Sequence, residues 1–195
     1  MPPPPPRKTM KHAKTVEAAG FALITNIVVS LGWAVSPLLK TRRVPDFIIG
    51  AKYEGLEAVT TNAAFEAYAG PGVIVELKAS SSPLGCNFDA SDTKSTTEDE
   101  NGFKETIRSR QTFGDAKGDF IFFFRFSEEG TTDDWELFVA PLKGEKKPTA
   151  LLERQHIRNL DILREHRLES FTKSNLSELK KMIVRAYVSK TQSIS

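Results

Sequence analysis

Three charged residues stand beside or inside two apolar runs of the sequence. Asp46 comes directly before Phe47-Ile48-Ile49, and Glu76 and Lys78 lie within the run 73–79. Ionised side chains are rarely buried unless they pair with an opposite charge or bind a metal ion. Two carboxylates next to one ammonium group are suited to holding a hard divalent cation, which prefers oxygen ligands.

Two short strands, 44–50 and 72–80, are predicted to position these residues. Each is a run of β-branched and aromatic residues bounded by Pro or Gly. Side chains alternate between the faces of a strand, so Glu76 and Lys78 leave the same face. A second interpretation stays open, in which Glu76 and Lys78 point outward from an edge strand and pair with neighbours.

The order Pro45-Asp46 followed by Glu76-x-Lys78 resembles the PD-(D/E)xK nuclease superfamily, which includes restriction endonucleases and Holliday-junction resolvases. The resemblance covers residues 14 to about 80 best. The order of the elements is most similar to that of archaeal Holliday-junction resolvases. It consists of a helix carrying Glu17, a Gly-Trp turn, a strand, a basic loop and a Pro-Asp strand. The implied fold is α/β and restriction endonuclease-like. It has a mixed central β-sheet flanked by helices, an αβββαβ core, a fifth strand and a helical C-terminal tail.

The same resemblance implies a Mg²⁺-dependent endodeoxyribonuclease, with Mn²⁺ as a possible substitute, of restriction-, resolvase- or repair-like type. The implied catalytic residues are Asp46, Glu76, Lys78 and Glu17, and the implied metal ligands are Asp46, Glu76 and the Leu77 carbonyl. Lys78 would stabilise developing negative charge or help to orient and deprotonate the attacking water. Glu17 has an alternative explanation, because acids favour the first turn of a helix.

DNA is the expected partner, and a homodimer is expected because two duplex strands need two sites. Lys40, Arg42 and Arg43 precede Asp46, where they form either a phosphate-binding surface or an ordinary polar turn. A catalytically inactive nuclease fold, acting as a nucleic-acid-binding or interaction module, is the alternative function.

Composition suits a single domain with a full core and a tail. The chain has 195 residues and a net charge of +2, with basic ends around an acidic middle. The predicted organisation is a Pro-rich basic arm (1–13), a nuclease-like domain (14–145) and a helical extension packed on that domain (146–195). The one cysteine, Cys86, forms no internal disulfide and fits a reducing cytoplasm. One cysteine and three scattered histidines do not support a zinc site.

A helix is predicted over 14–31, where apolar residues recur at helical spacing and Gly32 ends the pattern. Residues 18–39 carry no charge, so a membrane anchor is a third hypothesis, although the single apolar stripe argues against it. Asp89 and Asp92 fall in a predicted loop, where supporting carboxylates or plain solvation are both open. The remaining predictions are a loop over 80–97, strands over 33–39, 119–126 and 135–141, and helices over 61–68, 98–113, 150–163 and 175–188.

Overall fold

A phenylalanine-rich strand forms the middle of the sheet. In β7 (Phe120–Phe126), Phe122, Phe123 and Phe124 are fully buried although they alternate between the two faces. A strand that buries both faces must be covered on both sides and paired on both edges. β3 (Val73–Ser81) pairs with it in parallel and β8 (Trp135–Pro141) pairs with it antiparallel. The strand predicted over 119–126 is therefore an interior strand of the sheet.

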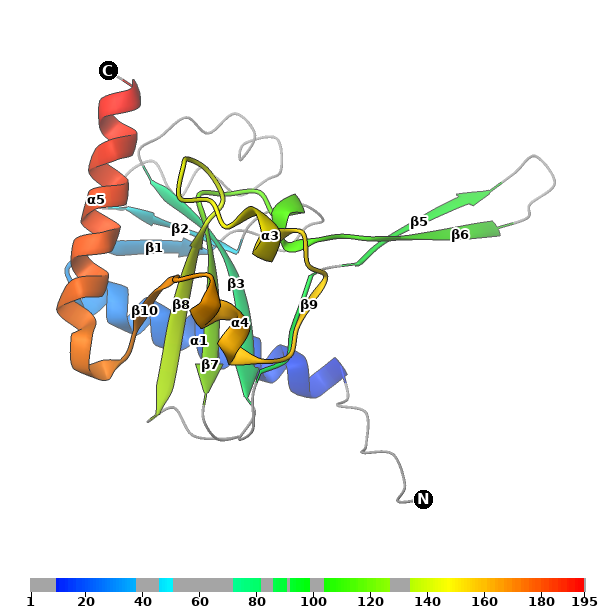
Figure 1. The fold of residues 1–195 in the computed structure, drawn as a ribbon, viewed down its shortest axis with the longest axis horizontal. Helices are drawn as coiled ribbons and strands as arrows, with labels where there is room; N and C mark the ends of the chain where they lie inside the picture. Colours follow the sequence, from blue (N-terminus) through cyan, green and yellow to red (C-terminus); the bar gives the residue numbers. More distant parts are fainter. Residues whose placement is uncertain are drawn as a thin grey trace.

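The computed structural model describes residues 10–37, 46–50, 72–81, 86–90, 92–98, 104–126 and 134–194. Its six-stranded sheet has the order β1-β2-β3-β7-β8-β10 and mixes parallel and antiparallel pairs (Figure 1). The mixed central sheet with flanking helices that the sequence predicted is confirmed. The remaining strands of this sheet are β1 (Ala34–Pro37), β2 (Phe47–Gly50) and β10 (Glu169–Phe171).

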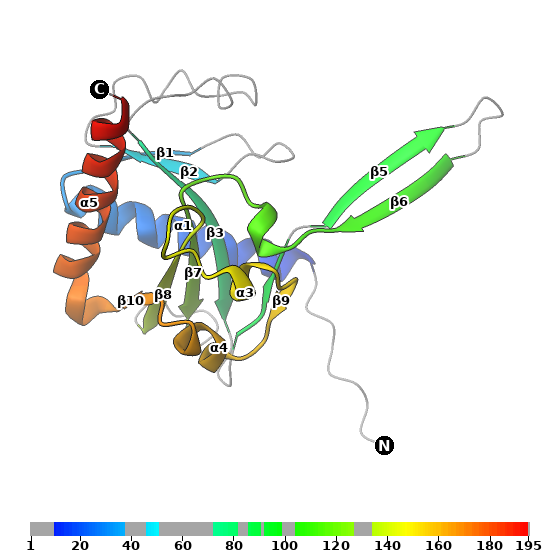
Figure 2. The ribbon, with the colours of Figure 1, turned by 45° about the horizontal axis from the view of Figure 1, so that its top comes forward.

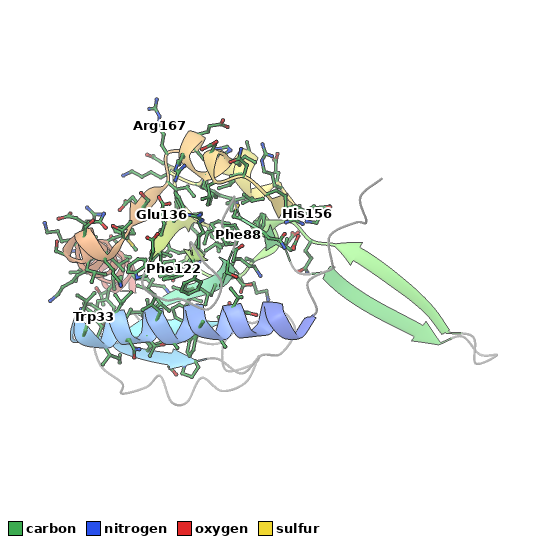
Figure 3. The ribbon with its side chains drawn as sticks, turned by 90° about the horizontal axis from the view of Figure 1, so that it is seen from below. Trp33, Phe88, Phe122, Glu136, His156 and Arg167 are labelled. Atoms are coloured by element: carbon green, nitrogen blue, oxygen red, sulfur yellow. The ribbon has the colours of Figure 1, made fainter. Side chains whose placement is uncertain are left out.

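Helices and short strands cover the two faces of the sheet. One face packs against α1 (Met10–Ser30) and α5 (Leu176–Ile194) through one apolar cluster that includes Phe122. A second apolar cluster, which includes Phe88, covers the other face. The elements that contribute to this cluster are η1 (Phe113–Asp115), α3 (Thr149–Leu152), α4 (Leu160–Glu165) and the strand pair β4 (Phe88–Asp89) and β9 (His156–Ile157). Figure 3 shows Phe122 lying near α1 and Phe88 toward the opposite layer.

The N-terminal helix follows its predicted apolar stripe. Ile24, Ile27 and Val28 are buried against the sheet. The helix ends where Gly32 adopts a positive φ of 80°, and the amides of Gly32 and Trp33 donate to the carbonyls of the last turn. It begins at Met10, earlier than the predicted residue 14. Among the helices described, none is long and apolar enough to cross a membrane.

Two predictions between β3 and β7 are wrong. The predicted loop over 80–97 contains β4 and β5 (Asp92–Glu98), and the predicted helix over 98–113 contains β6 (Lys104–Arg110). β5 and β6 form a two-stranded ribbon that projects from the body (Figure 2). The described residues thus hold strands where the αβββαβ order expected its second helix. Apolar residues at helical spacing misled the helix prediction, because Thr and Ile also favour strands.

The C-terminal segment differs from its predicted form in detail. Residues 150–163 were predicted as one helix, but α3 and α4 are separated there by β9. The final helix is preceded by η2 (Lys173–Asn175), which is capped by Thr172. Leu179 and Ile183 of α5 are buried in the core, as the apolar stripe predicted. The predictions for residues 1–9, 38–45 and 61–68 lie outside the described residues.

Candidate active site

The pairing of β2 with β3 brings Asp46 next to Glu76. Phe47 lies opposite Val75 in the antiparallel register, and the Asp46 amide donates to the Val75 carbonyl at 3.0 Å. Asp46 therefore lies beside this part of β3, close enough to Glu76 for the charge of that residue to raise its pKa. The Asp46 Oδ2 accepts a hydrogen bond from the Leu77 amide at 2.6 Å, which fixes the carboxylate against β3.

Glu76 and Lys78 share one face of β3, as predicted. Their side chains form an ion pair, with Lys78 Nζ 2.7 Å from Glu76 Oε1, and each is 16% exposed. The neighbouring residues across β7 are Ile121 and Phe123, both fully buried. β3 is an interior strand, between β2 and β7. The alternative prediction, in which Glu76 and Lys78 point outward from an edge strand, is therefore wrong about the edge position.

The charged residues around Asp46 and Lys78 shift the pKa values of both. Burial raises the pKa of Asp46 to about 6; the negative charges of Glu76 and Glu17 add to this, while the Leu77 amide and Lys78 oppose it. Burial lowers the pKa of Lys78, but attraction to Glu76, with smaller contributions from Asp46 and Glu17, outweighs burial and leaves that pKa raised. The four residues predicted to be catalytic therefore lie within electrostatic reach of each other, and Lys78 is a cation at neutral pH.

Helix α1 approaches β3 closely at Gly20, on the face of the sheet opposite to the one that carries Glu76 and Lys78. A Cβ atom built on Gly20 would lie 3.1 Å from the Ala79 Cβ and 3.6 Å from Leu77 Cδ2. Glu17 lies one turn before this contact, partly buried.

The donor set fits a hard divalent cation. Asp46 and Glu76 offer carboxylate oxygens, and the Leu77 carbonyl points to the same side of β3 as its amide, toward Asp46. Carboxylate and carbonyl oxygens are the ligands that a hard divalent cation such as Mg²⁺ prefers. Within the described residues no three His, Cys, Asp or Glu side chains form a metal-binding group, so the set rests on two carboxylates and a backbone oxygen.

A second aspartate, missed in the sequence, holds β3 from its other side. Asp119 precedes β7 as Asp46 precedes β2, and its Oδ2 accepts the Ile74 amide at 2.9 Å. It also accepts hydrogen bonds from Lys190 at 2.7 Å and Lys143 at 3.2 Å. Burial raises the pKa of Asp119, but the bonds from Lys190 and Ile74 outweigh this and hold it below its ordinary value. The sequence signal that could have identified Asp119 is its position directly before the apolar run 120–126.

The other polar candidates lie elsewhere. Asp89 pairs with His156 and Arg158, each at 2.6 Å, through exposed side chains of the β4–β9 region, and Asp92 lies in β5. Cys86 is buried, which raises its pKa to about 11. Two adjoining cavities of about 380 and 480 Å³ lie beside Phe120 and Pro141, and neither is lined by the residues of the candidate active site. Lys40, Arg42 and Arg43 lie outside the described residues.

Comparisons with known proteins give one solved structure. No protein-family model matches the chain, and no curated protein matches it. The chain is similar to a bacterial homing endonuclease, I-Ssp6803I. The match has 15% sequence identity and a TM-score of 0.36, and covers 77% of each chain. The functional assignment below is therefore based on the geometry of the candidate active site.

Proposed function

We propose that this protein is a Mg²⁺-dependent endodeoxyribonuclease of the PD-(D/E)xK type. The observation that carries the proposal is the convergence of Asp46, Glu76 and Lys78 on one face of the β2–β3 pair, tied by the 2.6 Å bond from Leu77 to Asp46. Asp119 makes the same kind of bond to β3 but is neutralised by two lysines. Asp46 instead lies near Glu76 and Glu17, whose charges raise its pKa, and near Lys78, whose charge lowers it.

In the proposed reaction, a water oxygen attacks phosphorus, the bond to the 3′ oxygen breaks, and that oxygen takes up a proton. Asp46, Glu76 and the Leu77 carbonyl would hold Mg²⁺, which when bound supplies a more acidic water and neutralises phosphate charge. Lys78, as an ammonium beside Glu76, would stabilise the negative charge that grows on the phosphate oxygens. This assigns Lys78 an electrostatic role rather than that of a general base.

The first experiment measures cleavage of supercoiled plasmid and of a four-way DNA junction with Mg²⁺ or Mn²⁺. We expect Asp46→Asn and Lys78→Ala each to lower the cleavage rate by about 100-fold or more. Asp89→Asn and Lys143→Ala are matched controls, because they remove the same charges at exposed positions outside the cluster. Equal rates in wild type and both cluster variants would reject the proposal.

A second candidate function is a nuclease-like module that binds nucleic acid without cutting it. The observation in its favour is the closed Lys78–Glu76 ion pair, which already occupies one of the two carboxylates. This candidate predicts DNA binding with no cleavage under either metal. It also predicts no thermal stabilisation by Mg²⁺, whereas the nuclease proposal predicts stabilisation that Asp46→Asn abolishes.

A further inference from the structure

A cavity of about 380 Å³ lies beside the start of β7 and the end of β8, away from the candidate active site. Phe120 and Val139 line it, and both pack with the apolar cluster that α1 and α5 cover. Glu76 and Lys78 lie on the other face of the sheet. The cavity is therefore separate from the residues proposed to cut DNA, and its volume is typical of a site for a small molecule.

The floor of the cavity is apolar and includes an incompletely covered aromatic residue. Phe120 is half-buried, whereas Phe122 and Phe124 on the same face of β7 are fully buried. Leu168, from the turn before β10, lines the cavity as well and is also half-buried. This floor offers an apolar surface on which a flat aromatic ring can stack.

The rim of the cavity carries positive charge that no described side chain neutralises. Lys146 and Arg167 both line the cavity and are exposed, and within the described residues neither forms an ion pair. Lys143 lines the cavity too, but its ammonium group is bound to Asp119 at 3.2 Å. Two unpaired cations at one rim suit an anion, and a phosphate dianion in particular.

Arg167 has a backbone conformation that favours glycine. Its φ of 51° is the one positive value outside the glycines among the described residues. It follows His166, the C-cap of α4, at the position where Gly or Asn commonly ends a helix. Figure 3 shows its side chain extending from the body. An arginine costs stability in this conformation, and such residues cluster at ligand sites, so its cation has a use other than folding.

We propose that this cavity binds a nucleoside monophosphate, with the base on Phe120 and the phosphate at Lys146 and Arg167. Glu145, a carboxylate of the same rim, would accept a hydrogen bond from a ribose hydroxyl. A volume of about 380 Å³ suits one nucleotide and not a length of strand. The proposal goes beyond the nuclease function and does not depend on it, because the two sites lie on opposite faces of the sheet.

Calorimetric titration in a chelator, without Mg²⁺, tests the site with adenosine monophosphate, adenosine and inorganic phosphate. We expect the monophosphate to bind with a dissociation constant of about 10–500 µM. Adenosine and phosphate should each bind at least about tenfold more weakly, because each keeps only part of the contacts. Lys146→Glu should weaken binding of the monophosphate by about tenfold or more. Lys147→Glu is the matched control, because Lys147 is the next residue of the same exposed loop and does not line the cavity.

Arg167→Gly separates binding from folding. Glycine suits a φ of 51°, so this variant should be at least as heat-stable as wild type. It should nevertheless bind adenosine monophosphate about fivefold or more weakly, whereas Arg167→Lys, which keeps the charge, should stay within about threefold of wild type. A purely structural role for Arg167 predicts the reverse, namely lower heat stability with unchanged binding.

Several results would overturn the proposal. One is the absence of any heat of binding with adenosine monophosphate up to about 5 mM. Another is an equal loss of affinity in Lys146→Glu and Lys147→Glu. Loss of binding in Asp46→Asn would place the nucleotide in the candidate active site instead. A 5′-phosphorylated tetranucleotide that binds more than about tenfold tighter than the monophosphate would identify the ligand as a DNA end. Binding of the monophosphate by a protein that cuts no DNA would reject the nuclease function and leave the nucleotide site intact.

Discussion

Two aspartates that hold β3 in the same way differ in what surrounds them. Asp46 and Asp119 each precede a strand and each accept a β3 amide. Lys190 and Lys143 neutralise Asp119, whereas Asp46 meets the charges of Glu76 and Glu17. Local geometry is therefore shared, and the sign of the surrounding charge separates a structural residue from a candidate metal ligand.

Replacing Asp46 should stabilise the metal-free protein at neutral pH. The folded pKa, about 6, lies above the unfolded value of 3.8. Stability from the protonated carboxyl is therefore full below pH 3.8 and lost as pH rises through about 6. With a chelator at pH 8, we expect Asp46→Asn to unfold with about 1–3 kcal/mol more free energy than wild type, and with little difference at pH 3.5. Urea titrations at both pH values measure this, and a gap that does not change with pH would contradict it.

Replacing Lys190 should destabilise the fold and show the opposite pH dependence. Lys190→Met removes the ammonium that bonds both Asp119 and the Gly72 carbonyl, and we expect a loss of about 1–3 kcal/mol at pH 7. The pKa of Asp119 is lowered, so this stability is present above its unfolded value of 3.8 and is lost as pH falls from that value through the lower pKa of the folded state. Urea unfolding of Lys190→Met at pH 7 and pH 3 measures both effects.

Lys181→Met is the matched control for Lys190→Met. Lys181 pairs only with exposed Glu178 on the same helix, so its loss should cost less than about 0.5 kcal/mol. An equal loss of unfolding free energy in the two variants would show that the contacts of Lys190 with Asp119 and Gly72 do not stabilise the fold.

At the scale of elements, the close approach of α1 to β3 sets the position of Glu17. Gly20 is the contact point, and its missing side chain leaves just enough room for Ala79. The backbone of Leu77, which holds Asp46, lies in the same strand. Packing between this helix and this strand therefore controls the spacing of the catalytic candidates.

A larger residue at Gly20 should push the helix away. We expect Gly20→Val to cost about 1–3 kcal/mol of unfolding free energy, because the core must shift to admit it. It should also lower the cleavage rate by displacing Glu17. Ala18→Val is the control on the exposed side of the same helix and should change both by far less. Chemical unfolding and plasmid cleavage measure the two effects.

Five strands of the main sheet could be predicted from their apolar runs, but β10, which is short and carries a charged residue, could not. Glu76 and Lys78 could be placed on one face from strand periodicity alone. The ribbon could not: Phe103, Ile107 and Phe113 recur at nearly helical spacing, and pairing partners fix a polar strand more than its own residues do. The role of Asp119 depends on Lys190, which is distant in sequence, so only the fold brings the pair together.

At the scale of the whole molecule, the ribbon is an appendage to a sheet with its own two cores. Asp92 and Arg110 lie opposite each other, so a turn of about two residues can replace residues 92–110. We expect the shortened protein to unfold cooperatively, within about 1 kcal/mol of wild type. Urea unfolding measures this, and loss of cooperative unfolding would contradict it.

The residues that cover the second face of the sheet are synthesised late. Phe88 pairs with Ile157, from the last quarter of the chain, in the layer over the face that carries Glu76 and Lys78. A ribosome therefore releases Asp46, Glu76 and Lys78 long before the residues that bury their surroundings. Until then the nascent chain exposes Ile121, Phe123 and their neighbours to solvent, a surface that chaperones bind. Burial of the candidate active site is thus a late event in the folding of each newly made molecule.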